Sequence, residues 1–109
     1  MKINKEPTAF QERVYAALRR IPRGRVITYA RLARTLACRS PRAVGQALRC
    51  NPFAPSVPCH RVISSNLTPG GYQGKTSGAQ LRRKLALLKA EGVLFTGNRL
   101  ADPRQLLGK

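Results

Sequence analysis

A cysteine and a histidine stand side by side in the segment Pro58-Cys59-His60-Arg61-Val62, and they offer the clearest chemistry in the chain. A thiolate is a strong nucleophile, and a nearby imidazole can take up the thiol proton. His60 is also the single histidine of the sequence. Adjacency does not establish contact, because neighbouring residues of a strand point to opposite faces. A buried structural cysteine beside a hydrogen-bonded histidine is therefore the alternative interpretation of this pair.

The charge of the chain indicates a polyanionic partner. Its 109 residues include 21 Lys and Arg but only 4 Asp and Glu, which gives a net charge of +17. Nucleic acid is the commonest partner of so basic a protein, whereas a pocket for a cationic ligand is disfavoured. Of the 21 basic residues 15 are arginine, whose forked guanidinium suits phosphates and bases.

The three cysteines, Cys38, Cys50 and Cys59, form no CxxC pair. With a single histidine, this pattern disfavours a disulfide framework and a zinc site, and we expect neither metal nor cofactor. No stretch reaches the roughly 18 apolar residues of a membrane helix, and the first ten residues lack the apolar core of a secretory signal. We therefore expect a protein of the cytoplasm (nucleoid-associated) or the nucleus, neither secreted nor membrane-bound.

Helix-start signals recur in the first half of the chain. Thr8 with Gln11 resembles a capping box, Thr28 is suited to cap a second helix, and Ser40-Pro41 is a strong start for a third. We predict helices over residues 9–20, 29–38 and 41–50, with a brief extended link at 25–28. The last two predict a helix-turn-helix, although their spacing alone also fits an ordinary helical hairpin. Arginines away from the apolar stripes favour the DNA-binding arrangement.

The second half of the sequence predicts less regular structure than the first half. Prolines make residues 53–58 a loop, residues 59–63 fit a short strand, and glycines make residues 66–74 a second loop. Ser77 with Gln80 resembles another capping box, and a helix with a stripe of leucines at 81, 85 and 88, with Ala86, then runs to about Ala90. Glu91-Gly92 ends it. We expect the polar tail after Gly97 to be partly mobile.

Together these signals predict a mostly α fold. We expect one small helical domain over residues 1–109, with an ordered core at about 8–95. It contains a helix-turn-helix of winged-helix-like type and a short strand or loop that carries Cys59.

Five motifs, in order, resemble the catalytic domain of the O6-alkylguanine-DNA alkyltransferases. The resemblance covers roughly residues 8 to 95, and the combination is specific although no single motif is. The matching segments are Ile21-Pro22-x-Gly24-x-Val26-x-Thr28-Tyr29; Arg42-Ala43-Val44-Gly45-x-Ala47; Asn51-Pro52 with Pro58-Cys59-His60-Arg61-Val62-Ile63; Gly70-Gly71-Tyr72-x-Gly74; and Lys89-Ala90-Glu91-Gly92.

The resemblance implies that Cys59 accepts the alkyl group from guanine O6 in a single-turnover displacement. His60 aligns with the base that takes the thiol proton through a water, and Glu91 with the carboxylate that orients this histidine. Asn51 aligns with the residue that holds the turn before the active-site loop. Tyr29 aligns with the phenol that donates a hydrogen bond to the leaving guanine. Without the resemblance, Glu91 would be interpreted as a surface acid at a helix end, Asn51 as the residue at which a helix ends, and Tyr29 as a core residue.

The resemblance also implies binding of double-stranded DNA containing O6-alkylguanine, and possible action on O4-alkylthymine. The target base leaves the stack, because O6 is out of reach of a thiol inside the duplex. In this family the recognition helix lies in the minor groove and contacts mainly phosphates. The implied DNA-binding and base-flipping residues are Arg42, Ala43, Gly45, Ala47 and Arg49. The implied pocket residues are Tyr29, Pro58, Val62 and Tyr72.

The chain departs from many family members in its length. We expect no N-terminal ribonuclease-H-like domain, and a monomer. The size matches the alkyltransferase-like proteins, which bind the lesion, replace the acceptor cysteine and hand O6-alkylguanine to nucleotide excision repair. Cys59 favours transfer. Cys50, Gln73 and Lys75 differ from common family residues. A lesion sensor with little transfer is the alternative, and a general basic DNA-binding module with a structural Cys–His pair is a third hypothesis.

Overall fold

Side-chain caps set the starts of the three N-terminal helices. The protein is seen in a computed structural model that describes residues 8–72 and 78–107. The side chains of Thr8, Thr28 and Ser40 each accept a backbone N–H in the first turn, and Gln11 completes a capping box with Thr8. The predicted starts are thus confirmed. The helices are α1 (Ala9–Arg19), α2 (Tyr29–Thr35) and α3 (Pro41–Arg49).

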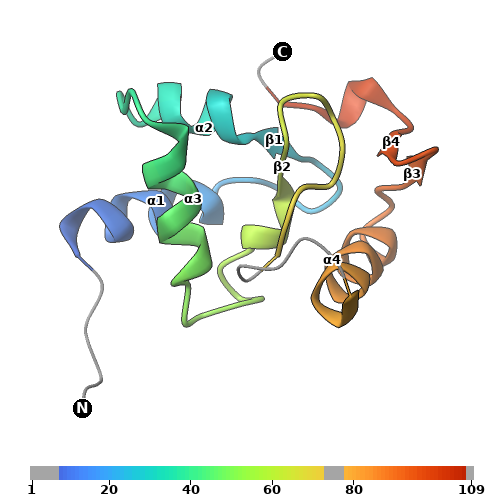
Figure 1. The fold of residues 1–109 in the computed structure, drawn as a ribbon, viewed down its shortest axis with the longest axis horizontal. Coiled ribbons are helices and arrows are strands. Elements are labelled where there is room, and N and C mark those ends of the chain that lie inside the picture. Colours follow the sequence, from blue (N-terminus) through green and yellow to red (C-terminus); the bar gives the residue numbers. More distant parts are fainter. Residues whose placement is uncertain (1–7, 73–77, 108–109) are drawn as a thin grey trace.

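Helices α2 and α3 form the predicted helix-turn-helix. They pack against each other, and α3 also packs against α1 (Figure 1). Their apolar stripes enter one buried cluster, while Arg34, Arg42 and Arg49 stay exposed. The phenol of Tyr15 on α1 donates a hydrogen bond of 2.9 Å to the Ala47 carbonyl of α3, which fixes the two helices together.

A short parallel strand pair lies between the helix-turn-helix and the C-terminal half of the molecule (Figure 1). It is formed by β1 (Ile27–Thr28) and β2 (Val62–Ile63). Ile27 pairs with Val62, and both enter the cluster that covers α1 to α3. Val26 and Ile63 point the other way, into a second cluster beside α4 (Gly78–Ala90). The pair therefore joins two cores.

The segment that contains Cys59 and His60 is a turn, which corrects part of the predicted strand. Cys59–Arg61 is a 3₁₀ helix (η1), and only Val62–Ile63 is extended. The Arg61 N–H bonds to the Pro58 carbonyl at 3.0 Å, so this part of the backbone satisfies itself locally instead of pairing with β1. Cys59 and His60 thus do not alternate across a sheet.

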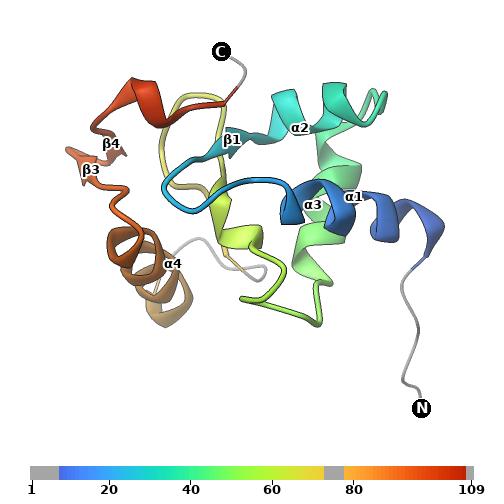
Figure 2. The same cartoon turned by 180° about the vertical axis from the view of Figure 1, so that it is seen from behind.

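The tail after Gly97 is folded onto the domain, contrary to our expectation. It contributes β4 (Arg99–Leu100), which pairs antiparallel with β3 (Phe95–Thr96), and a 3₁₀ turn, η2 (Pro103–Gln105). Leu106 then forms a parallel bridge with Val26 (Figure 2). The tail is polar overall, but its apolar residues Leu100 and Leu106 pack into the second cluster and hold it on the domain. The folded region therefore extends past residue 95.

Helix α4 ends at Ala90 as predicted, but its buried face differs from the expected one. Leu88 is fully buried, whereas Leu81 and Leu85 are half-buried and Ala86 is exposed. Lys84 takes the remaining buried position with 0% of its surface exposed. The expected cap at Ser77 lies outside the described residues. In the described part of the chain, no helix is long and apolar enough to cross a membrane.

We predict that Leu100→Ala lowers the free energy of unfolding by about 2–4 kcal/mol, because it opens a cavity in the second cluster. The neighbouring variant Arg99→Ala is the matched control. Arg99 is exposed on the same strand, and its truncation should change stability by less than about 0.5 kcal/mol. Denaturant unfolding of both proteins measures the difference. Equal stabilities would mean that the tail does not support the fold.

Candidate functional site

The thiol of Cys59 lies in a nearly closed environment, with 5% of the residue exposed. Burial raises the pKa of this thiol above its usual value, and the Asn51 side chain and the Lys84 ammonium oppose the rise. The pKa of Tyr29 and that of Tyr72 are raised too, first by burial and then by the nearby Cys59. Two phenols therefore share the surroundings of the thiol.

His60 and Glu91 form a buried pair across 31 residues of sequence. Nε2 of His60 lies 3.0 Å from Oε2 of Glu91, and the two side chains are 2% and 8% exposed. Burial lowers the pKa of His60 below its usual 6.5, although the carboxylate opposes the shift. The imidazole is therefore mainly neutral at pH 7.

Arg61 is the second partner of the same carboxylate and carries a charge. Its Nε and one terminal nitrogen donate to the two oxygens of Glu91 at 2.9 and 2.7 Å, and its other terminal nitrogen donates to the Ile21 carbonyl at 2.7 Å. Burial alone would raise the pKa of Glu91, but the bonds from Arg61 and His60 outweigh it and lower that pKa. Glu91 is thus held ionised and in one orientation.

The ionised carboxylate determines the tautomer of His60. A carboxylate only accepts hydrogen bonds, so Nε2 carries the hydrogen and Nδ1 presents its lone pair. Nδ1 is buried, and no residue in the described part of the chain bonds to it. The histidine thereby has a free basic nitrogen on the ring edge opposite Glu91.

Asn51 braces the loop that leads to Cys59. Its amide nitrogen donates to the Val57 carbonyl at 3.0 Å, and its amide oxygen accepts from the Phe53 N–H at 2.9 Å. The side chain therefore closes the loop between α3 and η1 from both sides. This position agrees with the expected role of Asn51 in holding the turn, and it leaves Asn51 8% exposed.

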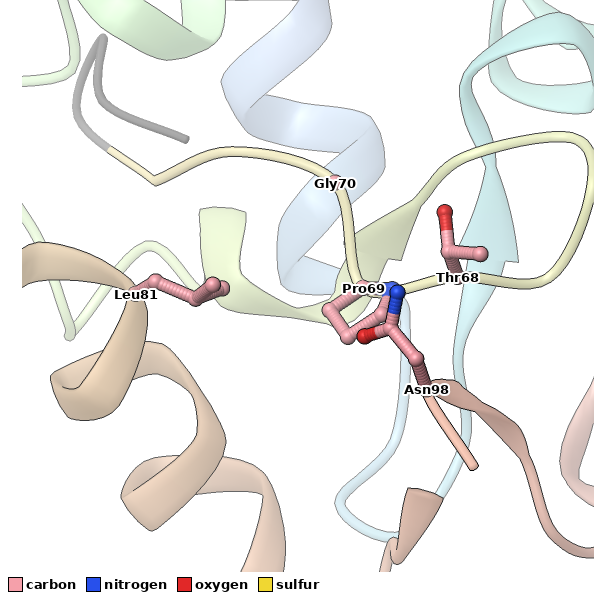
Figure 3. A pocket seen from close by; sticks show the side chains of 5 residues that line it. All are labelled: Thr68, Pro69, Gly70, Leu81 and Asn98. Carbon is pink, nitrogen blue, oxygen red and sulfur yellow. The ribbon is translucent and has the colours of Figure 1, made fainter. Parts of the chain in front are cut away.

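The loop at residues 68–72 packs closely against Tyr29. Gly70 has φ +72°, and a Cβ there would lie 2.9 Å from the Ser64 hydroxyl and 3.4 Å from the Tyr29 ring, so a side chain would collide with the site. A hollow borders this loop, lined by residues from the loop, from α4 and from the β3–β4 turn (Figure 3). Its lining residues are Thr68, Pro69, Gly70, Leu81 and Asn98.

The expected DNA-facing residues divide between two faces of α3. Arg42 and Arg49 are exposed, and Ala43 and Gly45 are partly exposed. A Cβ added at Gly45 would meet nothing within 4 Å, so this face is open. Ala47, in contrast, is 1% exposed and faces the core. The expectation that Ala47 presents a small side chain to DNA is therefore wrong.

The expected pocket residues all lie in the interior near Cys59. Pro58 and Tyr72 are buried, and Tyr29 is partly buried. Val62 has 0% exposure and belongs to the same apolar cluster as Cys59 and Tyr72. The side chain of Val62 thus helps to form the wall of this interior.

Sequence reasoning missed two charged residues of the site, Arg61 and Lys84. Arg61 lies in the matching motif around Cys59, but the resemblance predicted no role for it. Lys84 stands between Leu81 and Leu88 at spacings of three and four residues. That spacing places it on the leucine stripe of α4, and a cation on an apolar stripe was the signal that could have identified it.

The described residues include no cluster of side chains that could hold a metal ion. No group of three or more histidine, cysteine, aspartate or glutamate side chains comes together there. Among the residues described, Cys38 is partly exposed, Cys50 is exposed and Cys59 is buried, and each is a free thiol.

We predict that His60 titrates below pH 6.5 and that Glu91→Gln lowers its pKa further, because the carboxylate that favours the imidazolium is lost. Proton NMR measures this directly, since the chain has one histidine. Glu12→Gln on the exposed face of α1 is the control and should leave the titration unchanged. An unchanged value in Glu91→Gln would contradict the observed pairing, and a wild-type pKa above 6.5 would mean that the carboxylate outweighs burial.

The chain is similar to proteins that act on methylated DNA. It is 44% identical over 90 residues to the methylated-DNA–protein-cysteine methyltransferase of Methanothermobacter thermautotrophicus, covering 83% of this chain and 48% of the relative. The O6-methylguanine-DNA methyltransferase of Pyrococcus kodakaraensis has a similar structure, with TM-score 0.69 and 45% identity, over 79% of this chain and 47% of that one. The chain thus spans about half the length of these relatives.

A second similar structure is matched over its whole length. Atl1 of S. pombe, solved with damaged DNA containing O6-carboxymethylguanine, has TM-score 0.78 and 31% identity, over 96% of this chain and 100% of its own. The family model of the 6-O-methylguanine DNA methyltransferase DNA-binding domain matches residues 9–93, which include the helix-turn-helix, Cys59, His60 and Glu91. By this match and these relatives, the chain belongs to the family of 6-O-methylguanine DNA methyltransferase DNA-binding domains.

Proposed function

We propose that this chain repairs O6-alkylguanine in double-stranded DNA by moving the alkyl group to Cys59, once per molecule. The arrangement that carries the proposal is a buried thiol followed directly in η1 by a neutral histidine, whose orientation an ionised glutamate determines. Methyltransferase relatives share 44–45% identity with the chain.

The thiol needs activation because burial disfavours its ionised form. We assign this step to His60, whose Nδ1 lone pair faces away from Glu91. A water between Nδ1 and the thiol would carry the proton, and the imidazolium formed would be stabilised by the carboxylate already bonded to Nε2. Arg61 keeps that carboxylate ionised and in place.

In the proposed displacement, one bond forms and one bond breaks. Sγ of Cys59 forms a bond to the alkyl carbon while the bond from that carbon to O6 breaks, and the electron pair stays on guanine. The leaving base gains negative charge, which a hydrogen bond from the Tyr29 phenol would stabilise. Burial raises the pKa of Tyr29, so the phenol keeps its proton for this bond. The thioether on Cys59 is not hydrolysed, so the protein is consumed.

DNA is the partner that the charge supports. The chain carries +17, and among the described residues only Arg61 and Arg104 pair with a carboxylate side chain. The other described arginines have no carboxylate partner and can neutralise phosphates, although Arg13, Arg23 and Arg25 also donate to backbone carbonyls. We place α3 against the minor groove with Arg42 at the flipped base, since Arg42 is exposed near the helix start and Gly45 leaves the face open. The chain would act as a monomer without cofactor.

A lesion sensor is the second function that an observation favours. The fold matches Atl1, solved with DNA containing O6-carboxymethylguanine, at TM-score 0.78, against 0.69 for the Pyrococcus kodakaraensis methyltransferase. Such a protein would bind O6-alkylguanine and present it to nucleotide excision repair. The thiol at Cys59, with a base and a carboxylate aligned behind it, favours transfer over this alternative.

We predict that incubation with a duplex containing O6-methylguanine adds one methyl group to the protein, located on Cys59, because that thiol alone has a base beside it. Intact mass and peptide mapping measure the product. The variant Cys59→Ala should gain nothing, whereas Cys38→Ser and Cys50→Ser should gain the group as the wild type does. Tight lesion-specific binding without mass gain would support the sensor, and equal affinity for damaged and undamaged DNA would reject both functions.

We predict that Arg42→Ala slows transfer from the duplex by about tenfold or more, because about 1.4 kcal/mol of lost base-flipping energy is tenfold in rate. Transfer from free O6-benzylguanine should stay within about twofold, since no base has to be rotated. Single-turnover rates on both substrates measure this. Arg99→Ala, which removes an exposed charge from β4, is the control. Equal losses on duplex and free base would contradict the role of Arg42.

A further inference from the structure

Lys84 is a fully buried basic residue, and the transfer mechanism proposed above assigns it no role. It lies on α4, which packs against η1, and 0% of its surface is exposed. A lysine of ordinary function keeps its ammonium in water, because burying an ammonium without partners is costly. A buried lysine therefore needs a compensating set of acceptors.

Three backbone carbonyls form this set. Nζ of Lys84 donates to Val62 at 2.8 Å, to Pro69 at 2.5 Å and to Gly71 at 2.8 Å. Val62 belongs to β2 directly after the active-site turn. Pro69 and Gly71 belong to the loop that packs on Tyr29 and leads to Tyr72. One side chain thus joins the two segments that enclose Cys59.

The three acceptors match the protonated form of the side chain. An ammonium has three N–H donors, whereas a neutral amine has two, so loss of the proton leaves one carbonyl without a donor. An unpaired buried carbonyl is destabilising. Loss of one of these hydrogen bonds therefore weakens the attachment of the loop to the strand. The tether is therefore complete only while Lys84 is charged.

We propose that Lys84 is a positioning residue that holds the pocket loop at residues 69–72 against the strand that follows Cys59, and that it gives the pocket its shape for the alkylated base. The proposal rests on the function proposed above. The hydrogen bonds connect the loop and the strand directly, and Gly70 between the two bonded loop residues lies against Tyr29.

Among the described residues, no carboxylate faces the charge of Lys84. Its titratable neighbours are Cys59 and His60 of η1, and both are mainly neutral at pH 7, because burial raises the pKa of the thiol and lowers that of the imidazole. Burial lowers the pKa of Lys84 from 10.5 to about 7. The same ammonium favours the thiolate of Cys59, so its loss affects both the pocket and the nucleophile.

The variant Lys84→Met tests the proposal, because it keeps the length of the side chain and removes the charge and the three bonds. We expect transfer from free O6-benzylguanine to slow by about tenfold or more, with affinity for undamaged duplex within about twofold of the wild type. Arg82→Met is the matched control, since it removes an exposed charge two residues away on the same helix. It should weaken DNA binding and leave free-base transfer unchanged. Wild-type transfer by Lys84→Met would overturn the proposal.

A second measurement uses the unaltered protein and so does not depend on the folding of a variant. Carbon NMR of labelled lysine side chains gives the pH at which Lys84 loses its proton. Amide exchange at residues 70–72, corrected for its intrinsic pH dependence, should accelerate at the same pH, and free-base transfer should fall with it. Protection of these amides and a transfer rate that both persist through the titration would overturn the proposal.

A failure of the proposed transfer can be told apart from a failure of this inference. If the wild type gains no alkyl group from either substrate, transfer is rejected. The ratio of affinities for O6-methylguanine duplex and undamaged duplex then tests Lys84. Lys84→Met should reduce this ratio by about tenfold, and an unchanged ratio would reject the positioning role.

Discussion

The parallel pairing of β1 with β2 is the constraint on which the rest of the structure depends. These strands contain two residues each, yet the chain between them holds the whole helix-turn-helix and the loop that leads to Cys59. Because side chains alternate along a strand, Ile27 and Val62 enter one core while Val26 and Ile63 enter the other. A shift of this register by one residue would exchange the two sets and separate both cores from their partners.

Charge is distributed unevenly between the surface and the interior. The charged residues are mostly basic, and one of the four acids, Glu91, lies inside and is bonded by Arg61 and by the neutral His60. Arg61 satisfies most of the carboxylate, so Glu91 remains ionised without forcing a proton onto His60. Burial lowers the pKa of the imidazole, and the Arg61 charge lowers it further, so His60 is mainly neutral at pH 7. A second interior cation, Lys84, is balanced by carbonyl dipoles alone.

The distinction between an alkyl acceptor and a lesion sensor is carried by a few side chains on one shared scaffold. The same domain shape occurs in methyltransferases about twice as long and in Atl1, which has this chain's extent. Under the proposed function, base recognition would use the surroundings of Tyr29, Tyr72 and the loop near Gly70. Transfer would in addition use the thiol of Cys59 and the hydrogen-bonded pair of His60 and Glu91.

Local interactions were determined by the sequence alone. The caps at Thr8, Thr28 and Ser40 act on residues three positions away, so the helix starts follow from residue type. The family motifs identified Cys59, His60 and Glu91 as a set. Only the tertiary structure decided which face of α3 receives Ala47, that η1 is a turn, that the tail folds back onto Val26, and that Lys84 is buried. The burial of Ala47 and Lys84 and the return of the tail depend on contacts between segments more than ten residues apart, whose free energy the local sequence does not contain.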